Sequence, residues 1–197
     1  HSVRVANLAK LTCKALGLNA RTVKEIEQSA LLHDVGKIDA VYTEILRKEG
    51  PLTDNEREVI ESHVTKGVEL LETLSSVGTG VIQNVLYHHE RWDGRGYPHQ
   101  LAGQDIPLGA RVIGVCDAVD AMLSDRPYRK ALDLPTVRAE LERYSGIQFD
   151  PAVVRVLVES TALEEHSATV GRKIDLANLD REMDVPSRAL IARASSA

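Results

Sequence analysis

The stretch VLYHHERWDGRGYPHQL, residues 85–101, joins two adjacent histidines to a glycine-rich loop with a tryptophan, a tyrosine and two arginines. Apolar residues at helical spacing precede it, so a helix is expected to end near His88 and His89. Neighbouring residues on a helix project about 100° apart, so both histidines cannot lie on one apolar stripe. At a helix end, however, both can converge on an ion. The stretch therefore predicts metal ligands beside an irregular loop over about residues 90–106.

The helical period recurs along the rest of the chain, and no alternating strand pattern is evident. Typical caps and first-turn residues mark the expected helix ends: Gly17, Asn19, Thr53 with Glu56, Pro107, Asp133 with Pro135, and Asp150 with Pro151. Thr53 and Glu56 predict a capping box ahead of one long helix over residues 56–74. After about residue 161 the pattern weakens. The prediction is an all-α fold with a main domain over residues 1–160 and a tail over 161–197 of short helices or disordered chain.

Composition narrows the class of protein. A net charge of −5 over 197 residues argues against a general nucleic-acid binder, which is usually basic. Cys13 and Cys116 lie far apart and suggest neither a disulfide framework nor a thiolate metal site. No apolar run approaches the roughly 18 residues of a membrane span, and no signal peptide is evident. A cytoplasmic protein is expected, and because His1 already lies in a helical pattern, one lacking some upstream sequence.

Five of the seven histidines fall within or at the ends of apolar helices: His1, His33, His63, His88 and His89. Any one of them alone is more simply a buried, hydrogen-bonded histidine. Asp34 follows one of these histidines, and Asp117 lies in an apolar helix, where an unpaired carboxylate would cost several kcal/mol. Imidazoles and carboxylates from separate helices suggest a cage for two metal ions, and this ligand set suits iron, manganese or zinc better than magnesium or calcium. His99 and His166 are expected to play no part in it.

The segment HDVGK, residues 33–37, resembles the signature of the HD superfamily of metal-dependent phosphohydrolases. HHERWDGRGYP, residues 88–98, resembles the extended signature of the HD-GYP branch. HSVRV at residue 1, His63, IPLGARVIGVCDAVDAM, SDRPYRKAL and GIQFDPAVV follow the same branch in order, so the resemblance covers about residues 1–159. It implies a multi-helix HD-domain bundle with an irregular GYP loop.

The resemblance also implies a function. Members of this branch are phosphodiesterases that open cyclic di-GMP to pGpG, and some continue to GMP, by attack of a hydroxide that bridges the metals. Two or three divalent ions are implied, with iron or manganese the best fit. The implied metal ligands are His1, His33, Asp34, His63, His88, His89 and Asp117. Asp34, as the bridge, and Lys37 would be catalytic, and the implied substrate contacts are Gly96, Tyr97, Pro98, Arg126 and Arg129.

Several alternatives stay open at this point. Lys37 could be a solvated lysine, Arg126 and Arg129 a surface-exposed basic helix end, and Tyr97 either a substrate contact or a brace for the loop. The substrate could be a hybrid cyclic GMP-AMP or another nucleotide, and a catalytically silent cyclic di-GMP receptor is a further possibility. Residues 39–46 depart from the family pattern and are expected to form a lid. An upstream sensory or receiver domain and a homodimer are possible partners.

Overall fold

The computed structural model describes residues 1–48, 50–125 and 130–170, and this part of the chain is helical, which confirms the predicted all-α class. The helices are α1 (Ser2–Ala15), α2 (Ala20–Leu32), α3 (Ala40–Arg47), α4 (Asp54–Glu61), α5 (His63–Glu72), α6 (Thr79–Tyr87), α7 (Leu108–Leu123), α8 (Leu134–Arg143), α9 (Pro151–Glu159) and α10 (Ala162–Ser167), with a short 3₁₀ turn, η1 (Gly103–Asp105). Arg126, Arg129 and residues 171–197 of the predicted tail lie outside the described residues.

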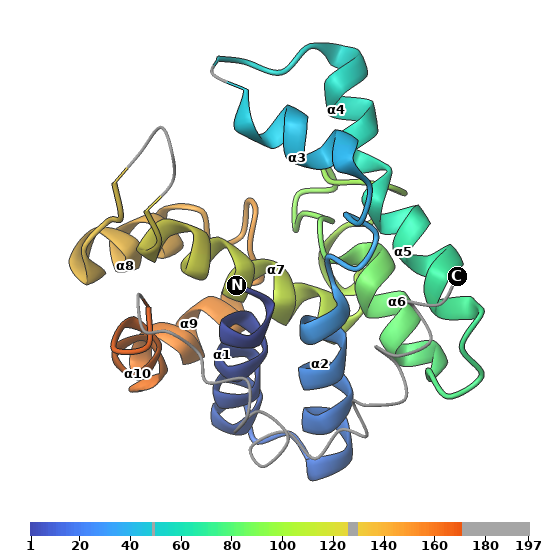
Figure 1. Cartoon of the computed structure of the whole chain (residues 1–197). Coiled ribbons are helices and arrows are strands. Elements are labelled where there is room, and N and C mark those ends of the chain that lie inside the picture. Colours follow the sequence, from blue (N-terminus) through green and yellow to red (C-terminus); the bar gives the residue numbers. More distant parts are fainter. Residues whose placement is uncertain (49, 126–129, 171–197) are drawn as a thin grey trace.

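Helix α7 forms the centre of the arrangement (Figure 1). It packs against α1 and α2, against α6, and against α8 and α9, and its apolar residues contribute much of the main buried cluster. A smaller apolar cluster lies around α5 and α6. Helices α3 and α4 stand away from this body in Figure 1. Within the described ranges, no helix is both long enough and apolar enough to cross a bilayer.

The predicted helix caps are present. The side chain of Asn19 accepts a hydrogen bond from the Thr22 amide at the start of α2, and Thr53 and Glu56 form the reciprocal capping box of α4. Asp133 and Asp150 cap α8 and α9, each followed by a proline in the first turn. These local signals depend only on residues within one turn, which explains why the sequence alone reveals them.

The one long helix predicted over residues 56–74 is instead two helices that meet at Ser62. The Ser62 hydroxyl donates to the carbonyl of Val59 at 2.7 Å, and the Nδ1 atom of His63 lies 2.6 Å from the carbonyl oxygen of Ile60. Both side chains thus compete for carbonyls that one continuous helix would pair with its own amides. The prediction of an uninterrupted helix was wrong for this reason, and the break lies directly before a candidate metal ligand.

Gly36 allows the HDVGK turn to lie against α5. A Cβ atom at this position would meet the carbonyl oxygen of His63 at 2.0 Å and the amide nitrogen of Gly67 at 2.6 Å. Both obstacles are backbone atoms, so neither can turn aside as a flexible side chain could. Glycine at position 36 therefore brings the residues that follow α2 close to the start of α5.

Replacing Gly36 with alanine should destabilise the protein by about 3 kcal/mol, at the upper end of the cost of overpacking. Thermal unfolding of the purified variant measures the effect. Gly78→Ala is a suitable control, because a Cβ at residue 78 would meet nothing within 4 Å and its φ of −72° suits any residue. Equal melting temperatures for the two variants would contradict the close approach of residue 36 to α5.

Candidate metal centre

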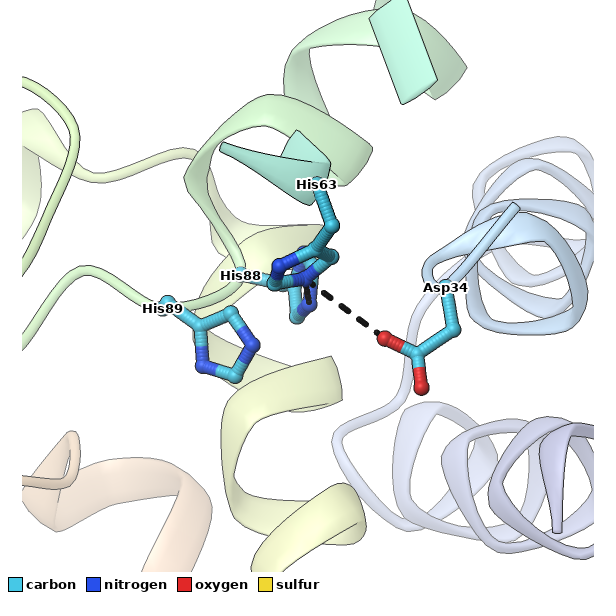
Figure 2. A group of neighbouring side chains, drawn as sticks. All are labelled: Asp34, His63, His88 and His89. Atoms are coloured by element: carbon cyan, nitrogen blue, oxygen red, sulfur yellow. Dashed lines mark hydrogen bonds and ion pairs between the residues drawn. The ribbon is translucent and has the colours of Figure 1, made fainter. Parts of the chain in front are cut away.

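Seven side chains converge, six of them from the ends of helices and Asp117 from within α7. His33 and His88 are the C-caps of α2 and α6, His63 begins α5, and His1 is the N-cap of α1. Their potential ligand atoms fall into two groups, within each of which all such atoms lie within 4.8 Å of one another: Asp34, His63, His88 and His89 in the first, and His1, His33 and Asp117 in the second. Figure 2 shows the first group.

Three of the buried rings share one orientation. Each places Nδ1 against the carbonyl oxygen three residues earlier: His33 against Ala30 at 2.7 Å, His63 against Ile60 at 2.6 Å, and His88 against Val85 at 2.7 Å. A carbonyl oxygen only accepts, so Nδ1 carries the proton and Nε2 keeps its lone pair. This is how outer partners usually fix histidines that bind metals.

The lone pairs on Nε2 fit a cation. The Nε2 atoms of His63 and His88 lie 3.4 Å apart, which is unfavourable for two acceptors unless a positive ion lies near both (Figure 2). Nε2 of His33 is buried and makes no hydrogen bond within the described part of the chain. A buried acceptor without a partner is costly and rare. The donor set of imidazoles and carboxylates therefore fits divalent transition metals.

Asp34 lies between the two groups. Its Oδ1 atom is 3.5 Å from Nε2 of His63, and its Oδ2 atom is 3.6 Å from Nε2 of His33. Lys37 places Nζ 2.7 Å from Oδ1. Burial acts to raise the pKa of Asp34, but the electrostatic effects of the His33 ring and of the Lys37 ammonium outweigh it and hold the pKa well below its usual range. A carboxylate in this position is ionised, and its two oxygens could bind one metal ion in each ligand group.

Burial dominates the titration of the three histidines in the first group. It lowers the pKa of His63 to about 4 and that of His88 to about 3, and it brings the pKa of His89 well below its usual value. The positive charge of Lys37 acts in the same direction on His63 and His89. At neutral pH these rings are therefore neutral, which is the form that binds a metal.

The second group is held differently. His1 places Nε2 3.1 Å from Oδ1 of Asp117 and Nδ1 2.7 Å from Oδ2 of Asp120. Burial acts to lower the pKa of His1, yet hydrogen bonds to these two carboxylates and their charges raise it to about 9. Oδ1 of Asp117 is also 4.0 Å from Nε2 of His33, so His1, His33 and Asp117 form a compact site.

The glycine-rich loop follows directly and is firmly held. The amides of Trp92 and Asp93 donate to the carbonyls of Gln148 and Ile147, and one carboxylate oxygen of Glu90 accepts from the His99 amide at 2.7 Å. These bonds fix the loop to the turn before α9 and close it on itself. The sequence alone had not pointed to Glu90 as an anchor.

Within this loop, Gly96 and Tyr97 lie against His89, a candidate metal ligand. A Cβ at residue 96 would meet the Glu90 Cα and the His89 carbonyl oxygen at 2.5 Å, so the backbone itself approaches closely there. The Tyr97 ring stacks on His89, with ring centroids 4.8 Å apart and an interplanar angle of 23°. The loop is therefore a lip beside the candidate metal centre, and Tyr97 forms its inner wall.

A cavity of about 260 Å³ lies alongside the ligands. His89 and Asp117 line it, as do Trp92, Arg111 and Asp150. Arg111 forms an ion pair with Asp150, so this part of the lining is neutralised. The candidate centre thus adjoins space that the packed core does not fill.

The structure also places the expected lid segment and the two remaining histidines. The expected lid, residues 39–46, overlaps most of α3. The hydroxyl of its buried Tyr42 lies 3.1 Å from the Ser62 hydroxyl, so the segment is anchored where α4 meets α5. Its role as a lid stays a prediction. His99 is exposed, but His166 is buried with Nε2 3.0 Å from Asp120, which sequence reasoning had not foreseen.

The chain is similar to known proteins over most of its length. The HD domain family matches residues 1–153. The chain is 41% identical over 161 residues to the cyclic di-GMP phosphodiesterase response regulator RpfG of Xanthomonas campestris, covering 81% of this chain and 42% of RpfG. It is 39% identical over 170 residues to a cyclic di-GMP phosphodiesterase of Pseudomonas aeruginosa, covering 86% of this chain and 41% of that protein.

One further relative and one solved structure are also similar to this chain. A 3′3′-cGAMP-specific phosphodiesterase of Vibrio cholerae is 35% identical over 160 residues, covering 81% of this chain and 30% of that protein. The solved structure of an HDG"Y"P protein from Bdellovibrio bacteriovorus superposes with a TM-score of 0.65 at 18% identity, covering 81% of this chain and 50% of the other, and so supports the fold. The chain spans less than half the length of these three curated relatives.

Proposed function

Because the chain belongs to the HD domain family, we propose that it is a metal-dependent phosphodiesterase that hydrolyses cyclic di-GMP to linear pGpG. The observation that carries the proposal is the pair of ligand groups that meet at Asp34, directly beside the loop containing Gly96 and Tyr97. Relatives named cyclic di-GMP phosphodiesterases support the choice of substrate. Hydrolysis onward to GMP is a possible second step of the same site.

Two ions are proposed, one for each ligand group, with Asp34 shared between them. Iron or manganese suits this mixture of imidazoles and carboxylates. When bound, such ions lower the pKa of a nearby water and offset negative charge on a phosphate. The protein's own part is to keep the His63 and His88 rings neutral by burial and turned with Nε2 inward.

Lys37 and the loop complete the proposed site. The Lys37 ammonium lies beside Asp34 and would stabilise charge on the phosphate or on the leaving oxygen. Gly96, Tyr97 and Pro98 would form the wall against which the substrate lies. Arg126 and Arg129 are proposed to bind the second phosphate or a guanine edge through their planar guanidinium groups.

A hybrid cyclic GMP-AMP is the second candidate substrate, because the Vibrio cholerae relatives named for that nucleotide are nearly as similar as those named for cyclic di-GMP. A silent receptor is less well supported. Such a protein would be expected to lose ligands, whereas all seven positions carry histidine or aspartate and their ligand atoms converge.

The direct test is to load the protein with manganese or iron and to follow cyclic di-GMP and 3′3′-cGAMP separately by chromatography. Appearance of pGpG from cyclic di-GMP supports the proposal, and the metal-free protein is the control. Faster cleavage of 3′3′-cGAMP would favour the second candidate. Tight binding of cyclic di-GMP without cleavage under any metal would favour the receptor.

Replacing Tyr97 with alanine should weaken cyclic di-GMP binding about 10-fold, because a stacking ring contributes about 1–3 kcal/mol per base. The ring is only half-buried, so surface remains for a ligand after it packs on His89. The metal content should stay at the wild-type value. Calorimetric titration measures the affinity, and Tyr97→Phe, which keeps the ring, should bind nearly as the wild type does. Unchanged affinity with a lowered melting temperature would mean that Tyr97 only braces the loop.

A further inference from the structure

Asp120 is a fully buried carboxylate in α7 that joins three helices. Its Oδ1 atom accepts from Nε of Arg4 at 2.7 Å, and its Oδ2 atom accepts from Nη2 of Arg4 at 2.9 Å and from Nδ1 of His1 at 2.7 Å. Nε2 of His166, in α10, lies 3.0 Å from Oδ1, at ion-pair distance but without the geometry of a hydrogen bond. A carboxylate removed from water is tolerated only when it is surrounded in this way.

This network holds a candidate metal ligand. The rings of His33, His63 and His88 are oriented by carbonyl oxygens of their own chain segments, three residues earlier. His1 is oriented instead by a side chain from a distant helix, with Nδ1 toward Asp120 and Nε2 toward Asp117. Its orientation therefore depends on the tertiary position of Asp120, and on whatever holds Asp120 in place.

His166 is one of the groups that hold Asp120 in place. The ring is only 2% exposed, and α10 packs against α1, the helix that follows His1. Glu164 of the same helix pairs with Arg138 of α8, which fixes α10 from its other side. The match to the HD domain family ends at residue 153, so α10 lies beyond the segment from which the metal ligands were expected.

We propose that His166 is a positioning residue of the metal centre. Through Asp120 it holds His1 with Nε2 turned toward Asp117. Helix α10 therefore contributes to the metal site formed by His1, His33 and Asp117. The inference rests on the proposed metal-dependent function. It goes beyond that proposal by assigning a role in metal binding to a residue that does not itself contact the metal.

The test is calorimetric titration of manganese into the metal-free protein, with the two sites resolved by their affinities. His166→Ala should weaken one site about 10-fold and leave the other unchanged. This is the lower end of the cost of about 10–100-fold for losing the direct outer partner of a ligand, because His166 supports that partner, Asp120, and does not contact His1. His166→Gln should recover most of the lost affinity, since its amide nitrogen can donate toward Asp120. Leu163→Ala is the matched control, because this fully buried residue packs the same helix without being part of the Asp120 network.

The outcomes distinguish a positioning role of His166 from general docking of α10 and from failure of the proposed function. Wild-type affinity at both sites in His166→Ala overturns the positioning role and leaves the proposed function standing. Equal weakening in Leu163→Ala and His166→Ala also overturns it, because general docking of α10 would then suffice. Failure of the wild-type protein to bind manganese or iron would overturn both the inference and the proposed metal-dependent function. Selective loss in His166→Ala with recovery in His166→Gln supports the proposal.

Discussion

Replacing Asp34 with alanine should empty both metal sites and abolish hydrolysis of cyclic di-GMP. The two carboxylate oxygens face different ligand groups, Oδ1 toward His63 at 3.5 Å and Oδ2 toward His33 at 3.6 Å. Affinity at each site should fall by more than about 100-fold, the upper end of the cost of losing even an outer partner. Elemental analysis of protein purified after loading with manganese or iron gives the metal content directly.

A matched control for this variant is Asp105→Ala. Asp105 is an exposed carboxylate in η1 and is not a member of either ligand group, so its loss should leave both metals in place. Asp34→Asn adds a second comparison, because it keeps the size of the side chain and removes its charge. If Asp34→Ala retained one metal at full occupancy, the carboxylate would belong to a single site and the shared role would be wrong.

The contrast between Asp117 and Asp120 shows which residues of such a site can be predicted from the sequence. Both carboxylates lie in the same apolar helix, three residues apart, and both are costly to bury alone. Asp117 was assigned as a ligand because the motif around it resembles a known pattern. Asp120 was overlooked, although the structure buries it more completely. Its partners, Arg4 and His166, are distant in sequence, and no local pattern reveals such a set.

The same distinction between local and distant causes applies to the fold. The caps at Asn19, Thr53 and Asp133 were predicted because each is satisfied within one turn. The break at Ser62 was not predicted, because it arises from side chains that hydrogen-bond to backbone carbonyls of the preceding turn. His63 is also turned toward candidate ligands from other parts of the chain. Helical periodicity continues across this point, so hydrophobic pattern alone could not reveal it.

Removing the Lys37 side chain should lower turnover of cyclic di-GMP by about 100–1,000-fold, the usual cost of losing one pre-positioned group that stabilises developing charge. Nζ lies 2.7 Å from Asp34 Oδ1, and the side chain is 24% exposed, so the ammonium is at the edge of the ligand group, where the proposed substrate would place a phosphate. Steady-state kinetics of Lys37→Ala with saturating metal measures the loss. The change should fall mainly on kcat, because the charge is needed most in the transition state.

Metal binding separates this role from a structural one. Before metals bind, Lys37 is a cation beside a carboxylate that the ions also need, so its removal relieves a repulsion of like charges. The affinity of Lys37→Ala for manganese should therefore equal or exceed that of the wild type, while catalysis falls. Lys10→Ala is a fair control, because Lys10 pairs with Glu27 and belongs to neither ligand group. Native turnover in Lys37→Ala would remove it from catalysis, and lost metals would make it a structural support of Asp34 instead.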